Sequence, residues 1–150
     1  MKQTVPRKRI KPGTKLVLLI MPVIIVAGGW MLWQELQQSP IRQAGIPLPA
    51  YGVVTIDLTT APFPPTVSDN VQLTVRLNAP GGRMAEVDQV TYRYGPIAGT
   101  DTFQGQMQAS SMDAFQAALQ FTSPGDWWIE VNLAHQGTSG SANFTLTVQE

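Results

Sequence analysis

The sequence predicts an all-β domain, an immunoglobulin-like antiparallel sandwich of about seven strands, preceded by a single N-terminal transmembrane α-helix. Three observations support this prediction. An uncharged apolar stretch lies near the N-terminus, and apolar and polar residues alternate in seven short segments of the remaining chain. Clusters of Pro, Gly and Ser separate these segments. Seven short strands in about 100 residues is the number typical of an immunoglobulin-like sandwich.

The charged residues divide the chain into two parts. Six of the ten basic residues lie in the first fifteen positions, and every Asp and Glu follows Trp33. From Gln34 onward four Arg face ten acidic residues, a net charge of −6. A domain that binds nucleic acid would carry a basic face, so we expect no nucleic-acid partner. The basic residues before the apolar stretch predict that residues 1–15 form a tail in the cytoplasm.

The apolar stretch runs from Leu16 to Trp33 and contains eighteen residues without a charge. As a helix it would be about 27 Å long, close to the hydrocarbon thickness of a bilayer. We therefore expect a transmembrane helix over residues 16–36, with Trp30 and Trp33 in the aromatic belt at the outer surface. A cleaved signal peptide has a similar beginning, but here the apolar run continues through Trp33, which favours an uncleaved anchor.

A linker is expected between the helix and the sandwich. Ser39-Pro40 would end the helix, and Pro47 and Pro49 would hold residues 37–50 extended. The extracytoplasmic domain would then occupy residues 51–150. The protein would be a single-pass protein of the cell membrane, with its N-terminus in the cytoplasm and its C-terminal domain outside.

The expected strands follow one another in order along residues 51–150. The clearest pattern places Val71, Leu73, Val75 and Leu77 on one face. A short helix is a possible reading of Met107–Leu119, but we expect strand or loop there. The seven segments are GVVTIDLT, VQLTVRL, DQVTYRYG, DTFQGQMQ, AFQAALQF, SPGDWWIEVNL and ANFTLTVQ.

Two adjacent tryptophans occur in the segment SPGDWWIEVNL. Trp127 shares its parity with Ile129, Val131 and Leu133, which predicts a place in the core. Trp128 falls on the opposite, outer face. It is either covered by a loop or exposed, and an exposed Trp128 would be a candidate anchor for a partner protein.

The alternation at Val71–Leu77, the residues Tyr92 and Tyr94, the segment FTSPGDWWIEV and the final ANFTLTV resemble the FixH and YtkA-like domains. These domains are small sandwiches tethered outside the cytoplasmic membrane. The resemblance covers roughly residues 70–148. It implies a partner of respiratory membrane machinery, or assistance in the maturation of copper-containing oxidases. The methionine- and histidine-rich segment of some relatives is reduced here to Met107 and Met112, which counts against metal handling.

No catalytic chemistry is recognisable in the sequence. The chain has no cysteine, and no nucleophile elbow or nucleotide-binding glycine pattern occurs. A soft Cu(I) site would combine His135, the single histidine, with Met107 and Met112, but the three residues show no ligand spacing. We therefore expect no catalytic residue, no cofactor and no resident metal.

Two functions follow as expectations. The first is a non-catalytic accessory subunit of a membrane complex of respiratory or photosynthetic electron transport. Its partners would be larger integral membrane subunits, an extracytoplasmic subunit and the lipid bilayer, with Trp30, Trp33 and Trp128 as partner contacts. The alternative is a membrane-tethered copper-handling or small-ligand-binding domain that assists oxidase maturation.

Overall fold

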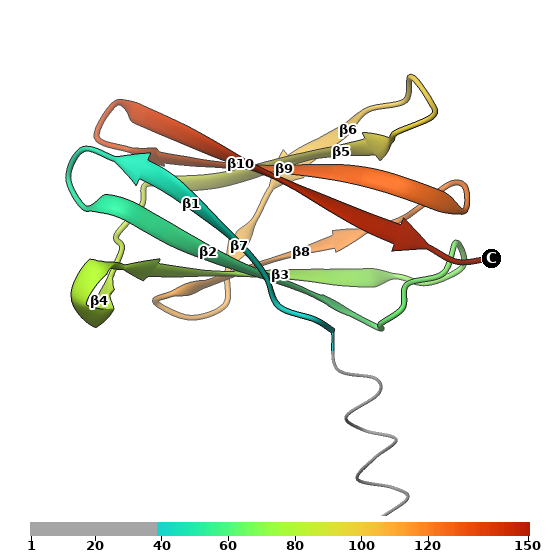
Figure 1. Ribbon diagram of the computed structural model, residues 1–150, viewed down its shortest axis with the longest axis horizontal. Helices are drawn as coiled ribbons and strands as arrows, with labels where there is room; N and C mark the ends of the chain where they lie inside the picture. The colour runs from blue at the N-terminus through green and yellow to red at the C-terminus, as the bar shows by residue number, and fades with distance from the viewer. Residues whose placement is uncertain (1–38) are drawn as a thin grey trace, which may run out of the picture. The chain divides into compact units, whose positions relative to one another are not determined.

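The computed structural model describes residues 39–150, and these residues form strands and one short 3₁₀ turn (Figure 1). The expected transmembrane helix, with Trp30 and Trp33, lies outside the described residues. Within the described residues no helix is long and apolar enough to cross a membrane. The elements are β1 (Arg42–Leu48), β2 (Gly52–Ala61), β3 (Val71–Ala79), η1 (Pro80–Gly82), β4 (Arg83–Met84), β5 (Gln89–Pro96), β6 (Phe103–Gln106), β7 (Gln108–Ala109), β8 (Ala114–Leu119), β9 (Gly125–His135) and β10 (Thr138–Val148).

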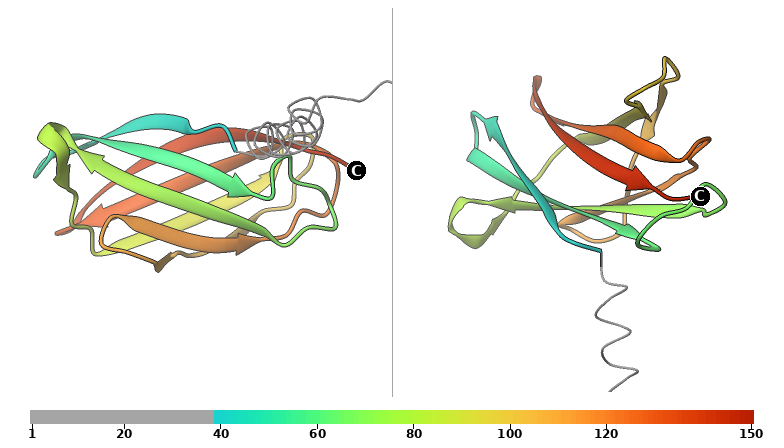
Figure 2. Two further views of the ribbon diagram at one scale, coloured as in Figure 1. Left: turned by 90° about the horizontal axis from the view of Figure 1, so that it is seen from below. Right: turned by 45° about the vertical axis from the view of Figure 1, so that its right-hand side comes forward.

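The strands form two antiparallel sheets that lie face to face, as the views in Figure 2 show. The first sheet has the order β1-β2-β3-β8-β7, with β4 added to the end of β3. The second has the order β10-β9-β5-β6. The seven segments expected from the sequence correspond to β2, β3, β5, β6, β8, β9 and β10. The prediction of an all-β domain with two antiparallel sheets is therefore confirmed.

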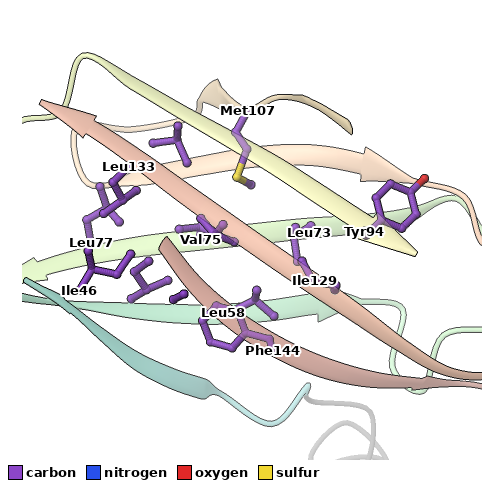
Figure 3. Packing of buried hydrophobic residues seen from close by; sticks show 14 of the residues in the cluster. Ile46, Leu58, Leu73, Val75, Leu77, Tyr94, Met107, Ile129, Leu133 and Phe144 are labelled. Carbon is purple, nitrogen blue, oxygen red and sulfur yellow. The ribbon is translucent and has the colours of Figure 1, made fainter. Parts of the chain in front are cut away.

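The core lies between the two sheets, and each long strand contributes every second side chain to it. On β3 the side chains of Val71, Leu73 and Val75 have no exposed surface, as the alternation predicted. On β9 the same holds for Ile129 and Leu133. Figure 3 shows Leu73, Val75 and Leu77 of β3 in the same layer of side chains as Ile129 and Leu133 of β9. Because both sheets have one apolar face, packing these faces together removes the apolar surface from water.

The prediction of a linker over residues 37–50 is wrong for most of that segment. Residues 42–48 are strand β1, which pairs with β2 from Arg42↔Leu58 to Leu48↔Gly52. Ile46 and Leu48 are buried in the core. Pro47 is tolerated because β1 is the edge strand of its sheet, where every second N–H points away from the neighbouring strand. The folded domain therefore begins before residue 42 and not at residue 51.

The segment Met107–Leu119 contains strand and loop, as expected, and it carries the chain from one sheet to the other. The N–H of Met107 donates to the carbonyl oxygen of Val90 in the second sheet, at 2.9 Å. One residue later, Gln108 pairs with Gln116 of the first sheet. The buried side chain of Met107 fixes this crossing, which Figure 1 shows between β6 and β7. Because β7 is only two residues long, it leaves β8 without a partner on that side from Ala117 onward.

An aromatic cluster fills one end of the core around Tyr94. Its ring lies near those of Phe103, Phe121 and Trp127, with centroid distances of 5.1, 5.8 and 5.8 Å. The hydroxyl group of Tyr94 donates to the carbonyl oxygen of Gln120 at 3.1 Å. Burial raises the pKa of Tyr94 above its ordinary value of 10.0, although the N–H of Gln120, which donates to the phenol oxygen at 3.4 Å, acts in the opposite direction. The cluster therefore favours the neutral phenol.

Tyr94 is expected to make the domain less stable in alkaline solution. The unfolded chain loses this proton near pH 10, before the folded domain does, so the stability is complete below pH 10 and falls above it. Tyr94→Phe should lower the free energy of unfolding at pH 8 by about 1 kcal/mol, because the Gln120 carbonyl loses its donor, and should flatten the alkaline decline. Urea unfolding of residues 39–150 at pH 8 and pH 11 measures both effects. Phe103→Leu is the control: it changes packing in the same cluster but should lose stability between pH 8 and pH 11 as the wild type does. If Tyr94→Phe lost as much stability over this pH range as the wild type, the alkaline effect would not arise from Tyr94.

Candidate functional site

The two adjacent tryptophans of β9 lie on opposite faces of the second sheet. Trp127 has no exposed surface and is the largest fully buried side chain in the described residues. Its indole N–H donates to the carbonyl oxygen of Ser123 at 3.0 Å, which satisfies the one polar atom of the ring. The prediction that Trp127 belongs to the core is confirmed. Trp127 therefore serves the fold and is not available to a partner.

Trp128 lies on the outer face and is half-buried, so it is neither fully covered nor fully exposed. It pairs with Gly95 of β5 and Thr145 of β10. A Cβ atom at position 95 would lie 3.1 Å from Cζ2 and 3.2 Å from Cε2 of the indole, and it would also clash with the Asp101 carbonyl oxygen. The glycine thus makes room for the indole, which covers the backbone where a side chain is missing. The ring is positioned by a cross-strand neighbour, and part of it remains accessible.

The surroundings of Trp128 are polar and weakly charged. Arg93 and Glu130, the next cross-strand pair, form an ion pair of 3.6 Å between Nη1 and Oε2. Because the arginine side chain is 52% exposed, this pair contributes little to stability. Asn143 and Thr145 continue the same face on β10. The outer face therefore offers one aromatic ring among hydrogen-bonding groups, a composition that suits contact with another protein.

The three residues considered for copper have very different surroundings. Met107 is buried in the core, where Figure 3 shows its side chain, whereas Met112 is 83% exposed in the loop between β7 and β8. His135 ends β9 and is buried, with its ring 5.2 Å from that of Tyr51. Its Nδ1 atom has no hydrogen-bond partner in the structure. The structure therefore places one thioether in the core and one in solvent, and it does not gather the three side chains into one site.

Acidic side chains do not form a metal centre in residues 39–150. No group of three or more His, Asp or Glu side chains in this part of the chain is close enough to hold an ion. Asp113 accepts a hydrogen bond from the hydroxyl group of Ser111 at 2.8 Å, and Glu130 is paired with Arg93. These acids are thus engaged locally on the surface.

A cleft with a volume of about 750 Å³ lies at the side of the sandwich where the chain crosses from β6 to β7. Side chains from both sheets line it, and none of them is charged. The amide of Gln72 donates to that of Gln116 at 3.0 Å. Tyr92 is half-buried at the cleft beside Gly105. The hydrogen-bonding side chains of the lining are Asn70, Gln72, Tyr92, Gln106, Gln108, Ser110 and Gln116.

Sequence reasoning missed this cleft. The only signal is the large number of glutamines at the polar positions of the strands, and such residues ordinarily mark a solvated face. Tyr92 also lines a second cleft of about 420 Å³ on the side of β6 that carries Gln104. The two clefts share Gln106, so an amide-rich surface surrounds β6.

No protein-family model matches the chain, and no curated protein matches it. Among solved structures it is similar to a crystal structure of "as isolated" FetP from uropathogenic E. coli, recombinantly expressed in the periplasm of E. coli. The identity is 10%, the match covers 72% of this chain and 95% of that chain, and the TM-score is 0.47. At this level the similarity carries no information about function.

Proposed function

We propose that this protein is a non-catalytic accessory subunit of a membrane protein complex of respiratory or photosynthetic electron transport. One N-terminal helix anchors it, its N-terminus lies in the cytoplasm, and its sandwich docks on the outer side against an extracytoplasmic subunit. The observation that carries the proposal is the position at which the folded domain begins. Ser39 is already fixed to the sandwich, only three residues after the predicted end of the helix at residue 36.

The attachment at Ser39 is specific. The N–H of Thr60 donates to the Ser39 hydroxyl oxygen at 3.0 Å, and the two hydroxyl groups lie 3.2 Å apart. The Arg42 guanidinium group lies over the Phe63 ring, 5.9 Å from its centroid. Burial lowers the pKa of Arg42 from its ordinary value. The first described residues are therefore held to the sandwich by contacts with β2 and with the segment that follows it.

The short connection restricts the partners. Three residues span at most about 10 Å, so a membrane helix that ends near residue 36 would hold the sandwich close to the bilayer. Such a domain cannot search the extracytoplasmic space, and its neighbours would be proteins of the same membrane. Ile41, which is 62% exposed next to the attachment, and the half-buried Trp128 are available for such contacts. In this proposal Trp30 and Trp33 contact lipid or the larger membrane subunits.

The order of the strands supports classification of the domain as an immunoglobulin-like sandwich. The sheets β2-β3-β8-β7 and β10-β9-β5-β6 have the order of the A-B-E-D and G-F-C-C′ sheets of immunoglobulin-like domains, with β1 added at one edge. The segment FTSPGDWWIEV, with its buried Trp127, supports membership of the FixH and YtkA-like domains. The copper-handling alternative finds no comparable support, since Met107, Met112 and His135 are not gathered around one position.

We expect the full-length protein, extracted from its native membrane in mild detergent, to migrate on a native gel with larger membrane subunits and an extracytoplasmic subunit. Insertion of a flexible linker of about 15 residues between Gln38 and Ser39 should reduce this co-migration, because the domain then explores a larger volume and its effective concentration at the partner falls. Mass spectrometry of the gel band measures both results.

The same linker appended after Glu150 serves as the control, because it leaves the attachment at Ser39 intact. This variant should migrate as the wild type does. Migration of the unmodified protein alone, at the mass of its monomer, would contradict the accessory-subunit proposal. Titration of the purified protein with Cu(I) would then be required.

A further inference from the structure

We propose that the cleft between β6 and β8 binds an uncharged oligosaccharide. The proposal goes beyond the accessory-subunit function and rests on the shape and chemistry of the cleft. Its volume of about 750 Å³ lies within the range of about 300–1,000 Å³ that is usual for small-ligand sites. Ala109, Ala117 and Ala118 leave room in the cleft because their side chains are small.

The polar groups of the lining suit a ligand with many hydroxyl groups. A primary amide carries one acceptor oxygen and one donor NH₂ group, so each can bind a hydroxyl group in either sense. The hydrogen bond from Gln72 to Gln116 fixes both amides and leaves the oxygen of Gln72 and the NH₂ group of Gln116 free for further hydrogen bonds. Such a donor and acceptor are complementary to the neighbouring hydroxyl groups of a sugar ring. Gln106 and Gln108 add amides from the segment that crosses between the sheets.

Tyr92 supplies the aromatic surface. A Cβ atom at position 105 would lie 2.7 Å from Oη and 2.8 Å from Cζ of Tyr92, so the ring occupies the space that a larger residue would fill. Gly105 therefore allows Tyr92 to reach the edge of the sheet, where it lines both clefts. The C–H groups of a sugar ring pack on an aromatic face, while its hydroxyl groups contact the amides.

The lining disfavours charged ligands and extended peptides. No charged side chain lines the cleft, so an ionic ligand would lose hydration without a counter-charge. A peptide that added to the open edge of β8 would find only Ala117–Leu119 free, because β7 already pairs with Phe115 and Gln116. Nor does the lining contain a large apolar side chain besides Tyr92 that would hold peptide side chains. A neutral polyhydroxylated ligand fits these features best.

The test uses the full-length protein in lipid nanodiscs, because the glycoside detergents commonly used for membrane proteins would themselves compete for the cleft. Cellohexaose, chitohexaose and maltohexaose are titrated separately, and binding is followed by calorimetry and by saturation-transfer NMR. We expect one of these hexasaccharides to bind. The double variant Gln72→Ala, Gln116→Ala and the single variant Tyr92→Leu should each weaken this binding about tenfold or more.

Gln43→Ala is the matched control. This glutamine is also exposed and hydrogen-bonded to a side chain, Asp57 at 2.9 Å, but it lies on β1 and outside the cleft. Its loss should leave oligosaccharide binding unchanged. The proposal is overturned if none of the three hexasaccharides binds at about 10 mM, or if the double variant binds as the wild type does. The proposal would also be overturned if an extended neutral peptide bound the cleft as tightly as the hexasaccharide does and displaced it.

Discussion

Deletion of residues 39–50 is expected to unfold the domain, although the deletion leaves all seven segments that the sequence predicted as strands intact. The deletion removes β1, whose Ile46 and Leu48 are buried in the core. Burying two such side chains contributes about 3–6 kcal/mol, and the pairing of seven residues with β2 is lost in addition. A domain of this size has a total stability of about 5–15 kcal/mol, so the loss is a large part of the whole.

The contribution of β1 to stability is measured by comparing two fragments, residues 39–150 and residues 51–150. The longer fragment should unfold cooperatively in urea, and the shorter should show no cooperative transition or a greatly lowered midpoint. A third fragment, residues 42–150, is the control: it keeps β1 and loses the hydrogen bonds of Ser39 to Thr60, so it should be weakened by about 1–2 kcal/mol. Equal midpoints for residues 39–150 and 51–150 would show that β1 is dispensable.

This edge strand also shows where sequence reasoning fails. In β1 only Ile46 and Leu48 are buried, and both lie near the end of the strand, so the alternation is short. Pro47 and Pro49 indicate an extended linker, since a proline cannot donate a hydrogen bond to a ladder. Only the position at the edge of the sheet makes Pro47 compatible with a strand. The position in the sheet is a tertiary property that composition does not encode.

The strands β3, β9 and β10 were predictable because their alternation is long. Each of β3, β9 and β10 packs one face against the core, so the physical requirement appears directly as a period of two in the sequence. Parity also placed Trp128 on the outer face correctly. It did not reveal that the ring lies over Gly95, because the pairing of these residues depends on the register between β5 and β9.

The amide-lined cleft was not predictable from a single strand. Gln72 belongs to β3 and Gln106 to β6, in different sheets, and each is simply a polar residue in its own alternation. The two meet at one cleft because the chain crosses between the sheets at Met107 and because β7 ends early. Periodicity predicts on which face of its sheet a residue lies. A binding site depends in addition on which residues of different sheets come together in the folded domain.

The adjacent tryptophans provide a direct measure of this difference between faces. Trp127→Ala is expected to lower the free energy of unfolding of residues 39–150 by about 3–5 kcal/mol, because it leaves a cavity in the aromatic cluster. It also removes the donor to the Ser123 carbonyl oxygen. Trp128→Ala, one residue further, should cost only about 0.5–1.5 kcal/mol, since its indole is half-buried over Gly95. Urea unfolding followed by circular dichroism measures both variants without dependence on tryptophan fluorescence.

The predicted loss of stability in Trp127→Ala arises from the volume of the missing side chain. A second variant at this position tests whether filling part of that volume restores stability. Trp127→Phe keeps an aromatic ring near Tyr94 and Phe121 and should therefore recover part of the stability that alanine loses. Equal costs for Trp127→Ala and Trp128→Ala would contradict the assignment of the two residues to different faces. If Trp128→Ala leaves the fold intact but removes co-migration with the membrane subunits, the indole acts as a partner contact. In that case the strand uses one tryptophan for the core and the other for assembly, as the proposed accessory subunit requires.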